Sequence, residues 1–139
     1  MDFPAPVARR IDELGYALEI RRHDGGKMGR ALHGAQAITV RNDLHWAAFV
    51  CTVLHEVLHL LNGPQPRGLK AKEEQAVRRQ TAREMIPDVR HLGEVLAWAS
   101  NPIEAADELG VDIYVLRNRI RHLHPSERGY LERRLADVH

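Results

Sequence analysis

Residues 47–61 read AAFVCTVLHEVLHLL, a stretch of helical length without Gly or Pro. Its apolar residues fall on all sides of a helix, which predicts a helix buried in the core of the protein. His55, Glu56 and His59 interrupt this apolar pattern in the order H-E-x-x-H. Because an unpaired buried charge is costly, these three side chains require partners inside the protein.

The spacing of the two histidines predicts a metal site. Residues i and i+4 of an α-helix share a face about 6 Å apart, so His55 and His59 can reach one ion while Glu56 lies beside its open coordination position. This constellation is typical of a zinc hydrolase. A chain of this composition would contain the motif by chance about 0.05 times. The alternative is a pair of core histidines hydrogen-bonded to the backbone, with Glu56 turned to solvent.

A third ligand must come from another part of the chain. The extended metzincin motif is excluded, because Asn62 and Gln65 stand where that class has Gly and His. Residues 62–68, NGPQPRG, end the first helix. Residues 69–86 then predict a second helix, which stops before Pro87.

Two neighbouring glutamates in this second helix are candidates for the third ligand. Glu74 falls on the stripe formed by Val77 and Thr81, whereas Glu73 lies toward the edge of that stripe. A glutamate from the next helix is a common third ligand for zinc, so Glu74 is favoured. Its alternative role is a surface i,i+4 pair with Arg78.

The order of these segments resembles that of the ImmA/IrrE metallopeptidases. The resemblance rests on ITV at residues 38–40, VLHEVLHLL at residues 53–61, Glu74, and MIP at residues 85–87. Members of that family share a strand, a helix with H-E-x-x-H, a second helix with the third zinc-binding Glu, and a short apolar run closed by Pro. The resemblance covers roughly residues 10–123.

The resemblance implies a zinc peptidase with His55 and His59 as ligands, Glu56 as general base and Glu74 as third ligand. It also implies a transcriptional regulator as substrate, because family members cleave, or are thought to act on, repressors in mobile elements and stress responses. The chain departs from the family in the second helix, where Ala, Asn or Asp, and Phe-Ala are usual. These departures, which bear on Glu74 more than on the histidines, are Val77, Arg78, Gln80 and Thr81.

Length and composition predict one compact domain. A chain of 139 residues with 44% hydrophobic content can bury one substantial core, which we divide into a catalytic core at residues 1–98 and a helical tail at residues 99–139. The net charge of +1 gives no reason to expect a protein that coats nucleic acid. The single Cys51 excludes an internal disulfide framework and suits a reducing compartment. The start MDFP and the lack of a membrane-length apolar run predict a cytoplasmic protein without membrane contacts.

The remaining patterns predict an α+β fold. Residues 7–14 predict a short helix, and residues 17–22, 31–33 and 37–41 predict strands separated by turns. A small sheet beside the metal helix follows. Its edge offers a place for an extended peptide substrate to add as a strand, although an edge that is only a structural border fits the pattern equally well.

The tail contains a second motif. Residues 102–121 predict a helix, a turn at Gly110 and a second helix with basic residues, as in a helix-turn-helix. DNA binding is therefore an alternative. The second helix also carries Asp112, and the chain as a whole lacks the concentrated positive charge of DNA-binding modules. A structural or substrate-docking role is favoured.

The expected reaction is hydrolysis of a protein substrate, with zinc held by His55, His59 and Glu74, and with Glu56 as the base. Two competing hypotheses are a DNA-binding regulator with a structural metal site and an inactive peptidase-like protein that binds a regulator. Cys51 lies too far along the helix to share an ion with both histidines, and a core role is expected for it. The sequence does not select a transition-state donor among six further histidines: His33, His45, His91, His122, His124 and His139.

Overall fold

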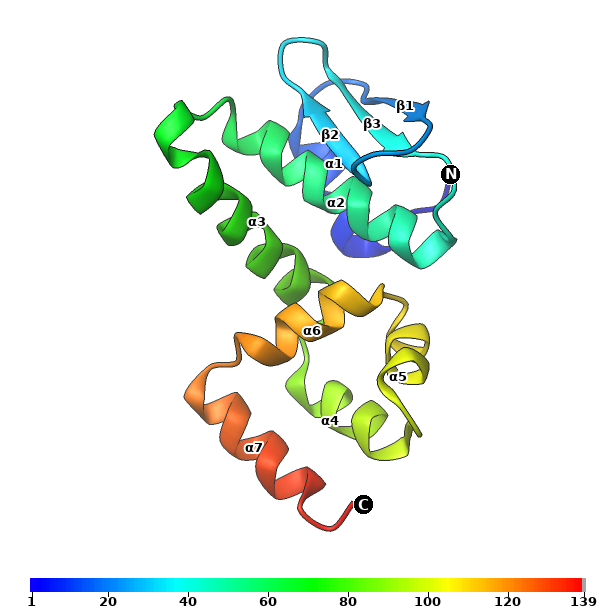
Figure 1. Cartoon of the computed structure of the whole chain (residues 1–139), viewed down its shortest axis with the longest axis vertical. Helices are drawn as coiled ribbons and strands as arrows, with labels where there is room; N and C mark the ends of the chain where they lie inside the picture. Colours follow the sequence, from blue (N-terminus) through cyan, green and yellow to red (C-terminus); the bar gives the residue numbers. More distant parts are fainter. Residues whose placement is uncertain (139) are drawn as a thin grey trace.

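The computed structural model describes residues 1–138. Over these residues the chain forms seven α-helices and one three-stranded sheet, so the expected α+β class is confirmed. Figure 1 shows the sheet with the first three helices in the upper part of the molecule and the last four helices below them. The elements predicted between residues 5 and 62 are present, with ends displaced by no more than two residues.

The N-terminal part consists of α1 (Ala5–Glu13) and three short strands, β1 (Glu19–His23), β2 (Gly29–Leu32) and β3 (Ala37–Arg41). The strand order is β1-β3-β2. β1 runs parallel to the central strand β3, and β2 runs antiparallel to it. β2 therefore forms an edge of the sheet.

The long helix α2 (Trp46–Asn62) packs on the sheet. Ile38 and Val40, two residues apart on β3, are fully buried and join Val53 of α2 in one apolar cluster. Side chains two residues apart on a strand share a face, so one face of the sheet is the core face. The buried position expected for the H-E-x-x-H helix is confirmed by this packing.

The helix α3 (Lys70–Met85) follows a single 3-10 turn at Arg67–Leu69. Gly63 closes α2 with a φ of 78°, in the region that favours glycine. The chain turns there and α3 lies against α2, with Val77 fully buried in the apolar cluster that α2 shares with the sheet. Residues that are well separated in the sequence, one set on α2 and the other on α3, therefore lie next to each other.

The last four helices build a second apolar cluster. They are α4 (Val89–Trp98), α5 (Pro102–Leu109), α6 (Ile113–Arg121) and α7 (Pro125–Leu135). Cys51 of α2 is also part of this second cluster, which confirms its expected core role. Helices α5 and α6 are joined at Gly110, where the chain takes the left-handed conformation, as the helix-turn-helix pattern predicts.

A buried arginine fastens the tail to α3. The Arg119 side chain of α6 is 1% exposed and donates hydrogen bonds to the Ile86 carbonyl oxygen at 2.7 Å and to Glu127 Oε2 at 2.7 Å. Arg83 of α3 donates to the same Glu127 carboxylate. One of the basic residues of α6 therefore serves the interior of the protein.

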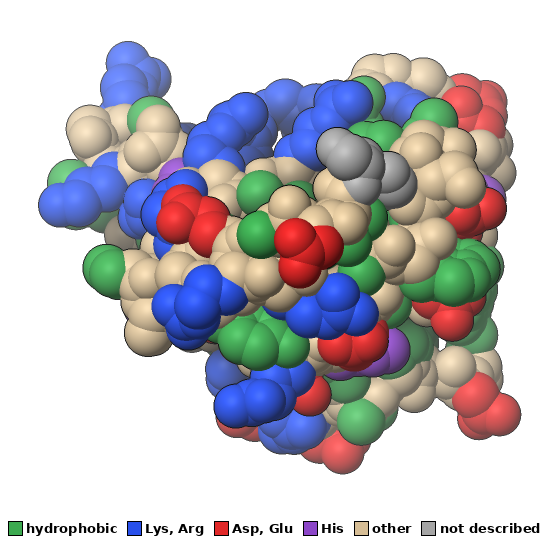
Figure 2. Space-filling view, turned by 90° about the horizontal axis from the view of Figure 1, so that it is seen from below, with side chains coloured by type: hydrophobic (Ala, Val, Ile, Leu, Met, Phe, Trp, Pro, Cys, Tyr) green, Lys and Arg blue, Asp and Glu red, His purple; other side chains and the backbone are tan. Residues whose placement is uncertain are grey.

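The surface carries mixed charge. Figure 2 shows Asp and Glu side chains interspersed among Lys and Arg on the face seen from below. Within residues 1–138 no helix combines the length and the apolar composition that a membrane crossing requires.

Candidate metal centre

Helix α2 places the two histidines of the motif side by side. His55 Nε2 lies 3.2 Å from His59 Nε2, and the ring centroids are 4.9 Å apart. The His59 side chain is 11% exposed and that of His55 is 19% exposed. The pair therefore occupies a sheltered site that solvent still reaches.

Helix α3 brings Glu74 to the same two nitrogen atoms. Glu74 Oε1 lies 2.6 Å from His55 Nε2, and Glu74 Oε2 lies 3.1 Å from His59 Nε2. The three residues each offer a ligand atom, and these atoms lie within 4.8 Å of one another. Arg78, one turn further along α3, approaches Glu74 Oε1 at 3.4 Å. Glu74 thus makes the surface pair as well as the contacts expected of a ligand.

Two of these distances fit a bound metal ion, whereas the 2.6 Å between His55 Nε2 and Glu74 Oε1 is shorter. Ligand atoms about 2.0–2.1 Å from a tetrahedral metal are about 3.3 Å from one another. The separation of 3.2 Å between the two Nε2 atoms and that of 3.1 Å between His59 Nε2 and Glu74 Oε2 are close to this value. His55, His59 and Glu74 could therefore hold a metal ion. No other group of this kind occurs among the described residues.

Glu73 contacts the other nitrogen of His59. Its Oε1 atom lies 2.9 Å from His59 Nδ1, and its Oε2 atom accepts a hydrogen bond of 3.1 Å from Asn62 Nδ2. The sequence pattern predicts Glu73 only as the less favoured ligand and does not predict this contact. A second acid beside the expected ligand, in the first turn of α3, was the available signal.

The carboxylates strongly favour positive charge at this site. Burial alone would lower the pKa of His59, but hydrogen bonds with Glu74 and Glu73 raise it to about 9. Hydrogen bonds from His55 and His59 hold the pKa of Glu74 well below its ordinary value. Without a metal ion, a proton on His59 supplies the balancing positive charge. A divalent cation can replace that proton, since metal binding to histidine requires the neutral imidazole.

Glu56 lies on α2 beneath the edge strand. It is 7% exposed, and burial raises the pKa of its carboxyl group. A Cβ atom added at Gly29 of β2 would lie 3.0 Å from Glu56 Cγ and 2.6 Å from Thr52 Cγ2. Glycine therefore permits the close approach of β2 to this part of α2. The role of Gly29 is not among the predictions from sequence, although a glycine beside a strand signals close approach.

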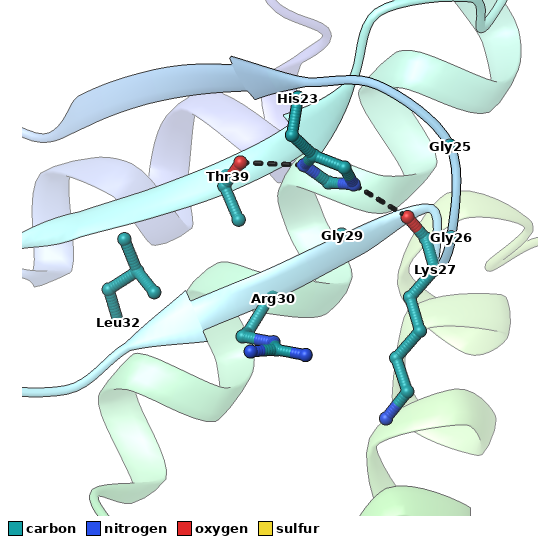
Figure 3. Close-up of a pocket in the computed structure, with 8 residues that line it drawn as sticks. All are labelled: His23, Gly25, Gly26, Lys27, Gly29, Arg30, Leu32 and Thr39. Atoms are coloured by element: carbon teal, nitrogen blue, oxygen red, sulfur yellow. Dashed lines mark hydrogen bonds between the residues drawn. The ribbon is translucent and has the colours of Figure 1, made fainter.

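A shallow cavity of about 230 Å³ borders Gly29 on the sheet (Figure 3). Its polar lining includes Lys27 and Arg30, and the His23 ring is held between Thr39 Oγ1 at 2.6 Å and the Lys27 carbonyl oxygen at 2.8 Å. Both ring nitrogens of His23 are occupied by these contacts. The cavity therefore offers positive charge beside the edge strand and no third metal ligand.

Three of the other histidines make local contacts within the protein. The His45 side chain accepts from the Ala48 amide and caps α2. His122 Nδ1 contacts the Asn118 carbonyl oxygen, and the His124 amide donates to Glu127. His139, also considered from sequence, lies outside the described residues.

No protein-family model, curated protein or solved structure matches this chain. The resemblance to the ImmA/IrrE metallopeptidases therefore rests on the motifs quoted above, and membership of that family stays a prediction. The structural basis for a function is the geometry of His55, Glu56, His59 and Glu74.

Proposed function

We propose that this protein is a zinc-dependent peptidase that cleaves a protein substrate. The supporting observation is the convergence of His55 Nε2, His59 Nε2 and a Glu74 carboxylate oxygen beside the buried Glu56. Two imidazoles and one carboxylate form a common ligand set for catalytic zinc, which keeps a fourth position open. When bound, zinc supplies a Lewis acid that polarises the scissile carbonyl and lowers the pKa of water.

Glu56 is the general base in this proposal. It accepts a proton from the attacking water and delivers it to the leaving amine as the peptide C–N bond breaks. Burial raises the pKa of Glu56, and a carboxylate with a raised pKa binds and releases protons closer to neutral pH. A Cβ atom added at Gly29 would lie 3.0 Å from Glu56 Cγ, so β2 closely covers the side chain of this base.

The unpaired side of the edge strand β2 favours an extended peptide as the substrate. β2 pairs with β3 on one side only, so its other side can receive an extended peptide through main-chain hydrogen bonds. Such a peptide would lie next to Glu56, because β2 meets α2 at Gly29. The resemblance to the ImmA/IrrE metallopeptidases favours a transcriptional regulator in the cytoplasm as the substrate.

The test combines metal content with cleavage. Purified protein should hold about one zinc per chain, and with zinc it should cleave members of an extended-peptide library, read by mass spectrometry. Glu56→Gln should keep the zinc and lose cleavage by at least about 100-fold. Equal cleavage by the zinc-loaded Glu56→Gln protein would contradict the proposed mechanism. Full zinc retention by both His55→Ala and His59→Ala would contradict the proposed site.

A further inference from the structure

The side chain of Glu73 is partly sheltered beside His59. It is 15% exposed, whereas the neighbouring Glu74 side chain is 37% exposed. Each carboxylate oxygen of Glu73 has its own partner: Oε1 contacts His59 Nδ1 at 2.9 Å, and Oε2 accepts from Asn62 Nδ2 at 3.1 Å. Two partners on one carboxylate fix its orientation.

We infer that Glu73 is a positioning residue that sets the tautomer and the ring orientation of His59. An ionised carboxylate only accepts hydrogen bonds, so Nδ1 of His59 must carry the proton in this contact. Nε2 faces His55 and Glu74 at 3.2 Å and 3.1 Å, and it offers its lone pair there once a metal ion replaces the Nε2 proton. A proton on Nε2 in place of Nδ1 would block coordination by His59.

The same contacts connect the end of α2 to the start of α3. Asn62 is the last residue of α2, and Glu73 lies in the first turn of α3. The hydrogen-bonded series Asn62–Glu73–His59 therefore holds the beginning of α3 against the helix that carries both histidines. Because Glu74 follows Glu73 directly, this connection also supports the position of the carboxylate that faces the two Nε2 atoms.

The inference rests on the proposed metal site, and its test is zinc affinity measured by competition with a chromophoric chelator. Glu73→Ala should weaken zinc binding by about 10–100-fold, as removal of such outer-shell partners typically does. Glu73→Asp should weaken it by a similar factor, because the shorter side chain does not reach Nδ1. Glu73→Gln should lose less than about tenfold, since its amide oxygen still accepts from Nδ1. Glu108→Gln, an exposed charge-matched control on α5, should bind zinc like the wild type.

A purely electrostatic role predicts a different order. Glu73 lies in the first turn of α3, where any negative charge stabilises the helix. In that case Asp would behave like the wild type, and Gln would behave like Ala. That order would overturn the inference.

A spectroscopic measurement checks the same point independently of affinity. In zinc-loaded, ¹⁵N-labelled protein the Nδ1 proton of His59 should exchange slowly with solvent in the wild type and in Glu73→Gln, and rapidly in Glu73→Ala. Unchanged exchange in Glu73→Ala would overturn the inference. His55→Ala separates the two levels of the argument: if it binds zinc normally, the proposed site fails. If it loses zinc while every Glu73 variant matches the wild type, only the role of Glu73 fails.

Discussion

Glu73 and Glu74 are adjacent in the chain but contact opposite sides of His59. Glu74 faces Nε2, and Glu73 contacts Nδ1. Successive residues of an α-helix are rotated by about 100°, so the two carboxylates leave α3 in different directions and enclose the imidazole between them. Both residues are glutamates, so it is the direction of the side chain that makes Glu74 the candidate ligand and Glu73 the positioning residue.

Removal of Glu74 should abolish stable zinc binding. We expect Glu74→Ala to lose its zinc on dialysis against a weak chelator, because only two protein ligands would remain. Arg78→Ala should keep about one zinc per chain, since the Arg78 contact with Glu74 at 3.4 Å is an exposed pair. Metal analysis after dialysis measures both. Zinc retention by Glu74→Ala would assign that glutamate to the surface pair alone.

Substitution of Gly29 should destabilise the contact between β2 and α2. In Gly29→Ala the new methyl group would lie 2.6 Å from Thr52 Cγ2, and such overpacking typically costs about 1–3 kcal/mol. Urea unfolding measures the loss. The double variant Gly29→Ala with Thr52→Ser lacks the clashing methyl group and should recover part of it. No recovery in the double variant would contradict the steric explanation.

The residues of the candidate site differ in how far sequence could predict them. His55, Glu56 and His59 belong to one helix, where the helical repeat alone fixes their relative positions. The prediction of Glu74 also depended on which face the second helix turns inward, and the apolar stripe through Val77 indicated that face. The Glu73–His59 contact depends on how α3 turns back at Gly63. A helical repeat carries no information about such a turn.

At the scale of elements, α6 shows why basic residues alone are a weak indicator of DNA binding. Its sequence IYVLRNRIR carries three arginines, but Arg119 points inward to Ile86 and Glu127. Arg117 and Arg121 are exposed. The preceding helix α5, PIEAADEL, has three acids and no Lys or Arg. A phosphate backbone would meet negative charge at the first helix of this helix-turn-helix arrangement.

The tail should therefore lack selective DNA binding. We expect the wild type to bind duplex DNA weakly and without sequence preference at physiological salt, and the variant Arg117→Ala with Arg121→Ala to behave in the same way. Fluorescence anisotropy over a salt series measures this. A reader helix would instead show a steep salt dependence and would lose about 1–3 kcal/mol per base-contacting Arg removed. That result would favour a DNA-binding regulator.

The Arg119–Glu127 pair should contribute strongly to stability, with a defined dependence on pH. Glu127→Ala leaves the buried Arg119 without its counter-charge, which typically costs about 3–5 kcal/mol. The Arg119 hydrogen bond lowers the pKa of Glu127 from 4.5 to about 2, so the folded state binds fewer protons than the unfolded state. The stabilisation is therefore complete above pH 4.5 and is lost as the pH falls toward about 2.

Chemical denaturation from pH 7 to pH 2.5 measures this effect. The difference in unfolding free energy between wild type and Glu127→Ala should be constant near neutral pH and should narrow below about pH 4.5. Glu132→Ala, an exposed change on the same helix, should alter stability by less than about 0.5 kcal/mol. A difference that stays constant down to pH 2.5 would mean that the ionised carboxylate is not the source of the stabilisation.

At the scale of the whole molecule, the candidate metal site joins two consecutive helices, α2 and α3, that contact different parts of the protein. α2 belongs to the cluster formed with the sheet and also contributes Cys51 to the cluster of the last four helices. α3 connects to α6 through Arg119 and Ile86. A metal ion held by His55, His59 and Glu74 would therefore cross-link the two helices on which both clusters depend.

Metal binding should accordingly stabilise the complete fold. A ligand that binds only the folded state adds RT ln(1 + [L]/Kd), or about 2.7 kcal/mol when its free concentration is 100 times Kd. We expect excess zinc to raise the unfolding free energy of the wild type and of Glu56→Gln by this amount, because Glu56 is the base and not a ligand in the proposed site. His59→Ala should show no such increase.

The gain in unfolding free energy should appear in near-ultraviolet circular dichroism, which follows tertiary packing, and in far-ultraviolet circular dichroism, which follows helix content. We expect one cooperative transition to link both clusters, so the two signals should move together. A gain confined to one of them would contradict this expectation.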